Sequence, residues 1–373
     1  MAARITRVKS SISPNPMPPA GFDPVVLGTS FCAAAALCYT GSNISMRFLA
    51  GSGADPMWSV CVREFVTVAV VGPWLLAKGL GGLPVIPRPR TFVLLVLAGL
   101  AVELGGNLGF QWALGVVGLG VTISAAYAVM LISAAVMGLI FLGESVPARS
   151  AASIGLLVAS IALLYLGAGQ LNRSNFVAGA AAPSLPRVLL GLGAACLAGS
   201  TFALLSISIR HATATGVPVA SIVVIITATG VLGLGALSLR QLGPAGLAAT
   251  RPEQLAVMLA AGVFNLLGFL AISTGLRYTT VVHANVLNAS QVALGALAGI
   301  VLFREPYTIW LAAGTLLTVA GVLLVGRPEA GKPRGADAQI PDARLPEIKS
   351  QLPNSKVQEG AEVGVAEDTD AAI

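Results

Sequence analysis

Residues 126–144 read AYAVMLISAAVMGLIFLGE, and residues 287–305 read LNASQVALGALAGIVLFRE. Each stretch is a run of apolar and small residues that ends on an acidic residue, Glu144 or Glu305, and each is followed by another apolar run. A run of this length crosses the hydrocarbon of a bilayer as a helix. The sequence therefore predicts a membrane protein with an internal repeat. At these span ends we expect both carboxylates to cap the next helix, reach lipid headgroups or take part in a gate.

About ten such apolar runs occur, five in each half of the chain. We expect an all-α integral membrane protein with ten transmembrane helices, arranged as two five-helix repeats. Because five is odd, the repeats must lie inverted relative to each other, which is typical of carriers that work by alternating access. The expected spans are 25–48, 56–77, 91–113, 118–142, 148–168, 187–209, 217–239, 253–275, 280–303 and 307–326.

This pattern divides the chain into four parts. Residues 1–24 form a basic N-terminal tail, 25–168 the first repeat and 187–326 the second repeat. Residues 327–373 are rich in proline, glycine and charge and contain few large apolar side chains. Such a composition cannot form a core, so we expect a disordered tail.

The composition excludes several classes of function. The chain of 373 residues is 55% hydrophobic and 10% charged, whereas a soluble domain has about 25% charged residues. Its four cysteines have no metal-ligand spacing, its two histidines are too few for a histidine-rich site, and no phosphate-binding loop follows a strand. We expect no metal, no cofactor and no ATP-driven pumping. We attribute the net charge of +6 to membrane topology and expect no nucleic-acid partner.

Basic residues gather on one side of the predicted membrane. That side has Arg4, Arg7, Lys9, Lys78, Arg88, Arg90, Arg149, Arg210, Arg277, Arg327, Lys332 and Arg334. The opposite side has Arg47, Arg173, Arg187, Arg240, Arg251 and Arg304. The positive-inside rule then predicts cytoplasmic termini in a multi-pass protein of the plasma or inner membrane.

The third span carries a polar stripe. Glu103, Asn107 and Gln111 follow the spacing i, i+4, i+8, which places them on one helix face beside several glycines. Glycines there permit close approach of a neighbouring backbone or local unwinding. Polar groups at this depth are costly and usually face a cavity, so we expect the stripe to line a translocation pathway. The alternative is that Asn107 and Gln111 join helices by hydrogen bonds while Glu103 stays neutral.

Two roles remain open for Glu103. It could take up and release a coupling proton, or it could form a permanent intramembrane ion pair with Arg63 of the second span. Glu64 is adjacent to Arg63, and we expect it to face another direction on the helix. Tyr39 and Tyr127 fall at a similar depth and are expected to line the same pathway.

The ninth span carries a second polar set. Asn285, Asn288 and Gln291 drift round one helix face. We expect Asn288 and Gln291, together with Asn265, to line the second half of the cavity, with interhelical hydrogen bonding as the alternative. We expect His283, near the inner end of that span, to be a structural group and not a proton relay.

Three stretches carry a family resemblance. ALGVVGLGVTISAAYAVMLISAAVMGLIFLGES at 113–145 and GLRYTTVVHANVLNASQVALGALAGIVLFREP at 275–306 resemble the EamA-type repeat of the drug/metabolite transporter superfamily. CVREFVTVAVVGPWLL at 61–76 is similar to the arginine-bearing second helix of that family. The resemblance covers essentially all of 25–326. It implies ten helices, a central cavity between the halves and export or import of small metabolites.

The expected function is secondary transport of a small polar or amphipathic metabolite, with export favoured by the resemblance. The expected partners are the lipid bilayer and the substrate, with protons as one candidate coupling ion, in a monomer or homodimer. One alternative is an intramembrane enzyme that uses Glu103 and Tyr127 for acid–base chemistry on a lipid-linked substrate. Another is a non-catalytic sensor that docks through its acidic tail. An inverted repeat distinguishes the carrier from the enzyme, which does not need one. Removal of residues 330–373 distinguishes it from the sensor, because a carrier should still transport without the tail.

Overall fold

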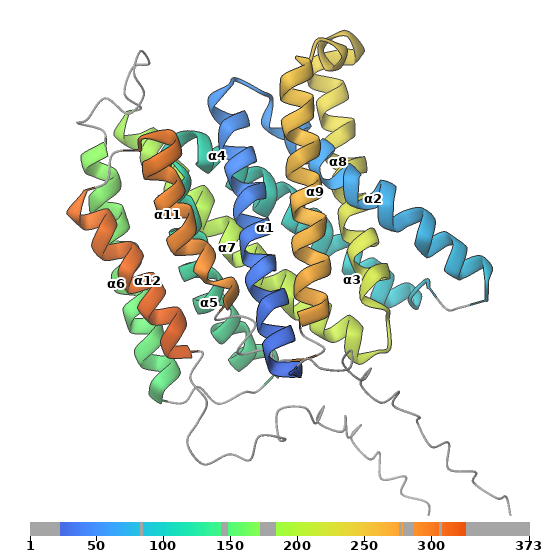
Figure 1. Cartoon of the computed structure of the whole chain (residues 1–373), viewed down its shortest axis with the longest axis horizontal. Coiled ribbons are helices and arrows are strands. Elements are labelled where there is room, and N and C mark those ends of the chain that lie inside the picture. The colour runs from blue at the N-terminus through green and yellow to red at the C-terminus, as the bar shows by residue number, and fades with distance from the viewer. Residues whose placement is uncertain are drawn as a thin grey trace, which may run out of the picture. The chain divides into compact units, whose positions relative to one another are not determined.

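The computed structural model describes residues 23–82, 85–142, 148–171, 184–275, 278, 287–305 and 308–325 (Figure 1). All regular structure in these ranges is helical. The predicted disordered tail after residue 326 lies outside the described residues, as does nearly all of the predicted N-terminal tail.

The helices agree with the predicted spans to within a few residues at most ends, and the largest difference, nine residues, is at the C-terminal end of α8. Proline occupies the first position of α2, α3 and α9, where its missing N–H group costs no hydrogen bond. Residues 280–286 of the predicted ninth span lie outside the described part. The elements are α1 (Pro24–Gly51), α2 (Pro56–Leu80), α3 (Pro89–Leu100), η1 (Ala101–Asn107), α4 (Leu108–Val117), α5 (Leu119–Leu142), α6 (Ala148–Leu171), α7 (Leu185–Ala214), α8 (Val219–Ala248), α9 (Pro252–Gly275), α11 (Ser290–Phe303) and α12 (Ile309–Val325).

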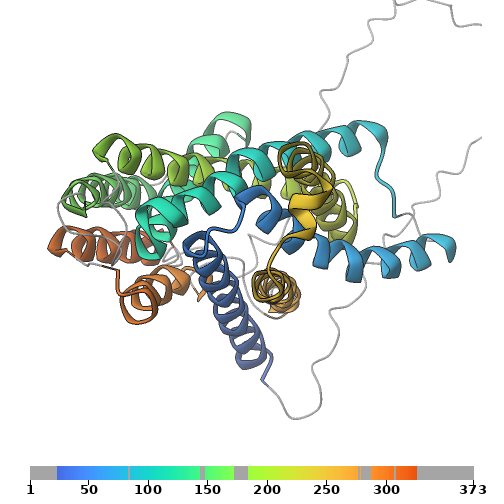
Figure 2. The same cartoon turned by 90° about the horizontal axis from the view of Figure 1, so that it is seen from above.

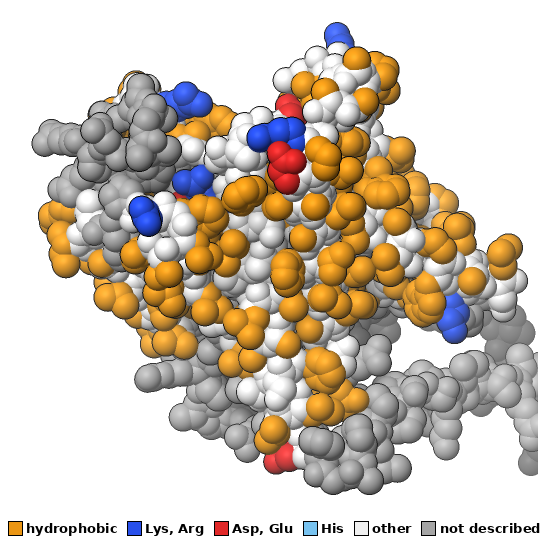
Figure 3. Space-filling model, turned by 45° about the horizontal axis from the view of Figure 1, so that its top comes forward, with side chains coloured by type: hydrophobic (Ala, Val, Ile, Leu, Met, Phe, Trp, Pro, Cys, Tyr) orange, Lys and Arg blue, Asp and Glu red, His pale blue; other side chains and the backbone are white. Residues whose placement is uncertain are grey.

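These helices form a multi-pass membrane protein. Within the described ranges, six helical segments are long and apolar enough to cross a membrane, and three further apolar helices are shorter. Hydrophobic side chains cover most of the face seen in Figure 3, and the charged side chains on it gather near the helix ends. This distribution suits a hydrocarbon layer between two polar boundaries.

Neighbouring helices come from distant parts of the chain. α1 lies between α9 and α11, α7 packs on α5 and on the α3–η1–α4 span, α2 packs on α8, and α6 packs on α12 (Figures 1 and 2). In the last pair, Ser153 Oγ donates to the Gly321 carbonyl at 2.7 Å and Ser160 Oγ to the Gly314 carbonyl at 2.9 Å. Small and hydroxyl-bearing residues at such interfaces let helix backbones approach closely in lipid.

Some interhelical contacts recur at a constant separation along the chain. Gly99 of α3 packs against Thr229 of α8, and Gly262 of α9 packs against Val66 of α2. Gly99 and Gly262 are 163 positions apart, and so are Val66 and Thr229. The α3–α8 and α9–α2 contacts are therefore counterparts.

The α1–α2 and α7–α8 turns share the same backbone geometry. Gly53 and Gly216 both have positive φ angles, 73° and 83°, which glycine adopts without steric cost. Three backbone hydrogen bonds recur in both turns. In the first turn Ser52 donates to Phe48 and Leu49, and Ala54 donates to Leu49. In the second Thr215 donates to His211 and Ala212, and Val217 donates to Ala212, while Gly216 makes a fourth bond to Thr213. Every donor and acceptor of the three recurring bonds is again 163 positions from its counterpart.

The third span is widened and not unwound. Residues Ala101–Asn107 form a π-helix between α3 and α4, in which the Leu108 N–H donates to the Glu103 carbonyl. Close approach, the other expectation for the glycines here, is observed, because a Cβ atom at Gly106 would lie 2.6 Å from Thr201 Oγ1 of α7. Single π-helical turns of this kind occur frequently at functional sites.

Candidate functional site: a buried polar layer and an ion pair at one helix end

Glu103 lies at the centre of the candidate site. Its residue is 2% exposed, and its Oε2 accepts a hydrogen bond from Asn107 Nδ2 at 2.9 Å. It packs against Gly230 of α8, where a Cβ atom would lie 2.7 Å from Glu103 Cδ. The carboxylate therefore occupies space that only a glycine on α8 leaves open.

The expectation that Glu64 faces away from Arg63 is wrong. Arg63 Nε and Nη2 both donate to Glu64 Oε1, at 2.9 and 2.5 Å, and the two side chains are 8% and 3% exposed. Adjacent Cβ atoms on a helix do point in different directions, but the long flexible arginine stem carries the guanidinium round to its neighbour. The hypothetical Arg63–Glu103 ion pair is not formed in this structure.

Among Arg63, Glu64 and Glu103, the one ion pair leaves the Glu103 carboxyl group without a bonded cation. Arg63 and Glu64 both interact electrostatically with Glu103. Within the described part of the chain, no ion pair involves Glu103. Glu64 thus binds the Arg63 guanidinium, whereas Glu103 accepts a hydrogen bond from Asn107.

A second polar group joins α5 to the start of α11. Asn288 Nδ2 donates to Tyr127 Oη at 3.3 Å, and Gln291 Nε2 donates to Asn288 Oδ1 at 2.7 Å. The structure thus brings three predicted site residues together. Tyr39 of α1 packs against Gly268 of α9, where a Cβ atom would lie 2.9 Å from Tyr39 Cδ1.

The remaining predicted residues are more scattered. Gln111 Nε2 donates to the Met46 carbonyl of α1 at 3.0 Å, and Gln111 Oε1 is buried without a partner among the described residues. Asn265 is half-buried on α9. Three predicted residues lie outside the described part of the chain, namely Glu144, His283 and Asn285.

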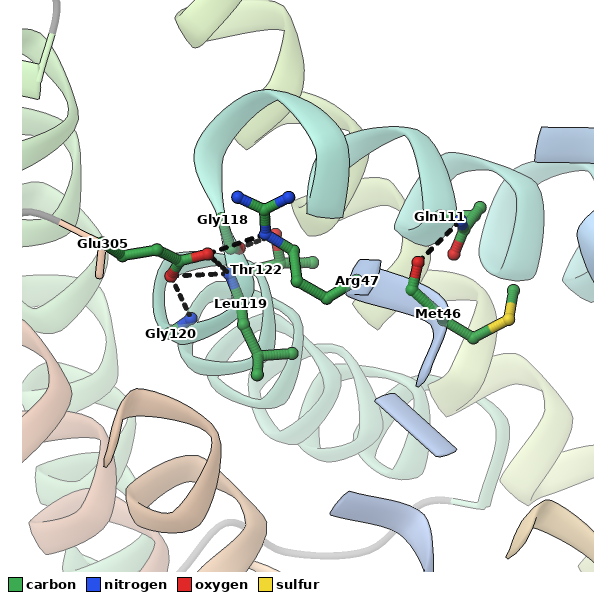
Figure 4. Close-up of polar contacts among 8 residues, drawn as sticks. All are labelled: Met46, Arg47, Gln111, Gly118, Leu119, Gly120, Thr122 and Glu305. Carbon is green, nitrogen blue, oxygen red and sulfur yellow. Dashed lines mark hydrogen bonds and ion pairs between the residues drawn. The ribbon is translucent and has the colours of Figure 1, made fainter. Parts of the chain in front are cut away.

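The structure adds an ion pair at the C-terminal end of α1. Glu305 Oε1 lies 2.7 Å from Arg47 Nε, and both side chains are 8% exposed (Figure 4). The Leu119 N–H donates to both Glu305 oxygens at 2.9 Å, and the Gly120 N–H donates to Oε2 at 3.4 Å. Glu305 therefore caps α5. The expectation that it caps the next helix, α12, is wrong.

Arg47, expected near the end of the first span on the less basic side of the membrane, is buried within α1. Its guanidinium carbon lies 5.2 Å from the centre of the Phe303 ring, a distance at which a cation and an aromatic face attract each other. Sequence reasoning missed this site because Arg47, Leu119 and Glu305 are far apart in the chain. The available signal was Gly118, a glycine directly before a helix start.

The described helices form a multi-pass membrane protein that buries polar side chains between its helices. Residues 189–327 match the model of the EamA-like transporter family, which confirms the resemblance drawn from the sequence over the second predicted repeat. This match gives the intramembrane-enzyme hypothesis no support.

A crystal structure whose title states no function is similar in fold. It is 20% identical in sequence, it covers 83% of this chain and 99% of its own, and the TM-score is 0.53. No curated protein matches the chain.

Proposed function

We propose that this protein is a secondary carrier with ten membrane helices, which moves a small metabolite by alternating access. The two inverted repeats are residues 25–168 and 187–326. The carrier lies in the plasma or inner membrane with both termini in the cytoplasm, and it works as an exporter of a polar or amphipathic compound.

The repeated contacts are the observation that carries this proposal. We replace each helix of one half by its counterpart in the other half. The α1–α9 contact then becomes the contact of α7 with the α3–η1–α4 span, and the α2–α8 and α6–α12 pairs stay the same pairs. The constant 163-residue separation of the Gly99 and Gly262 contacts agrees with this exchange. Two halves with equivalent packing can adopt each other's arrangement, which is the basis of alternating access around a fixed site.

The substrate pathway passes through the polar layer. Its lining residues are Tyr39, Arg63, Glu103, Asn107, Gln111, Tyr127, Asn265, Asn288 and Gln291. The charges come from the first half alone, because the positions 163 residues after Arg63 and Glu103 are Ile226 and Leu266. The repeat therefore supplies the motion, while the first half supplies the charge for recognition.

The substrate carries an ammonium group, as an amine or a zwitterion. Because Arg63 bonds Glu64, the Glu103 carboxylate lacks a cation in an ion pair. A buried ionised group needs a partner of opposite charge. A substrate ammonium or a proton would supply it, so the two would compete at Glu103.

Counterflow in proteoliposomes tests this function. Labelled amines, zwitterions, neutral sugars and anions are offered in parallel at two pH values to the wild-type protein, Glu103→Gln and the surface control Glu253→Gln. We expect exchange of an ammonium-bearing compound that depends on pH in the wild type and the control and is lost in Glu103→Gln. Exchange of anions alone, or full exchange by Glu103→Gln, contradicts the assigned site.

A further inference from the structure

We propose that Glu305, Arg47 and the first amide groups of α5 form a clamp that closes one end of the transport pathway and opens once in each cycle. We call this set the Glu305 clamp. The inference rests on the proposed carrier function, and it assigns positioning roles to two residues outside the polar layer.

The clamp joins the two halves of the chain. Arg47 is on α1 and Leu119 begins α5, both in the first half, whereas Glu305 follows α11 in the second half. Figure 4 shows the Arg47 and Glu305 side chains pointing toward each other beside the α5 N-terminus. Any motion that separates the halves at this end must break the 2.7 Å ion pair or the 2.9 Å amide contacts.

The clamp can open because its bonds can be exchanged for water. The Glu305 carboxylate accepts from a guanidinium and from the N-terminal amides of α5, where the helix dipole favours a negative charge. Every one of these groups is well solvated once water enters. The α6–α12 contact is made by serine hydroxyls and backbone carbonyls and has no charged groups for such an exchange.

The surroundings of the carboxylate leave little room for any other arrangement. A Cβ atom at Gly118 would lie 2.6 Å from Glu305 Cδ, and one at Gly299 would lie 2.5 Å from Glu305 Oε2. The Glu305 N–H also donates to the Gly299 carbonyl at 3.0 Å, which fixes the residue's backbone. A glycine in the α4–α5 turn and a glycine on α11 thus form a recess shaped to the carboxylate.

A polar stripe connects the clamp to the candidate site. Asn107 donates to Glu103, and one turn further along the same span Gln111 donates to the carbonyl of Met46, the neighbour of Arg47. A substrate that draws Asn107 away from Glu103 acts on the segment that holds α1 in place. This connection gives substrate binding a physical route to the clamp.

Cysteine labelling tests the clamp without any substrate. The four native cysteines are replaced by alanine, and Asn107→Cys serves as the reporter in oriented vesicles treated on either face with a membrane-impermeant maleimide. In Glu305→Gln and Arg47→Met we expect labelling to be at least about tenfold faster from the face at the α1 C-terminal end, because an unpaired buried charge shifts a two-state equilibrium by that much or more. Glu305→Asp keeps the charge on a shorter side chain, so its labelling rate should lie between those of the wild type and Glu305→Gln.

Glu253→Gln is the matched control. It removes a carboxylate of an exposed ion pair with Arg251, whose guanidinium reaches the Ser52 carbonyl just after α1. Equal labelling rates in Glu305→Gln and Glu253→Gln overturn the clamp. Equal acceleration from both faces also overturns it, because that pattern reports a loosened fold and not one opened end.

A tether supplies the opposite manipulation. Arg47→Cys with Glu305→Cys, in the cysteine-free background without the reporter, is joined in proteoliposomes by a short bis-maleimide whose spacer contains a reducible disulfide. We expect counterflow to stop on crosslinking and to return on cleavage, whereas unimpaired counterflow in the crosslinked protein overturns the clamp. If the wild type moves no substrate at all, the carrier proposal fails, and the labelling rates still decide whether this end opens.

Discussion

The Arg63–Glu64 pair is an ion pair between neighbours in sequence within the interior of the protein. Both residues are buried, and both lie within electrostatic reach of Glu103. Removing one partner of such a pair leaves an uncompensated charge, whereas removing both leaves none. The pair therefore fixes how much negative charge the site presents.

The first prediction concerns this pair. Arg63→Met should lower the free energy of unfolding by about 3–5 kcal/mol, because it leaves Glu64 buried without a cation. The double variant Arg63→Met with Glu64→Met should recover most of that loss. Thermal unfolding in detergent measures both. Glu253→Gln, in an exposed pair, should cost less than about 1 kcal/mol, and a similar effect of Arg63→Met would contradict the account.

At the scale of elements, the α4–α5 turn decides how α5 begins. Gly118 has φ 85° and ψ 176°, a conformation that residues with a side chain rarely adopt. The turn places the first amides of α5 against Glu305. The start of α5 and the Arg47–Glu305 ion pair thus depend on the same carboxylate.

The second prediction separates two effects of a side chain at Gly118, namely backbone strain at a positive φ and a clash with the Glu305 carboxylate. Gly53→Ala, at a positive φ with no atom within 4 Å of the new Cβ, should cost only backbone strain, about 1–2 kcal/mol. Gly118→Ala should cost clearly more, because its Cβ also displaces Glu305. The difference in melting temperature measures this, and equal losses would show that the carboxylate does not need the recess.

At the scale of the whole molecule, the repeated glycine contacts make a third prediction. Gly99→Leu and Gly262→Leu should destabilise the protein to a similar degree, because each drives a side chain into its counterpart contact on α8 or α2. Gly193→Ala on α7 is the control, because nothing lies within 4 Å of its new Cβ. A melting temperature of either leucine variant equal to that of Gly193→Ala would argue against equivalent packing.

The fourth prediction extends the clamp by the repeat. Arg210 stands 163 positions after Arg47, and Glu144 stands 161 positions before Glu305. The Glu144 residue and the Arg210 side chain lie outside the described part of the chain, so this pairing is a prediction from the sequence. Glu144→Gln should speed labelling of Asn107→Cys from the face opposite to that opened by Glu305→Gln. Acceleration from the same face would contradict the inverted arrangement.

Much of the helix layout was predictable, because the membrane fixes how long an apolar segment must be. The Glu103–Asn107 hydrogen bond was also within reach, since residues four apart meet on a helix. The π-helical widening of the third span was not. The widened segment packs against α7, and a sequence pattern does not contain that contact.

The sequence by itself determined the membrane class, the helix bounds and the polar residues of the third and ninth spans, because hydrophobicity and local spacing act along one segment at a time. Only the tertiary structure decided which charges meet. Arg63 bonds Glu64 because its stem can bend back, and Arg47 meets Glu305 because α1, α5 and α11 converge at one end. Ion pairs depend on distances in space, and a position along the chain does not fix those distances.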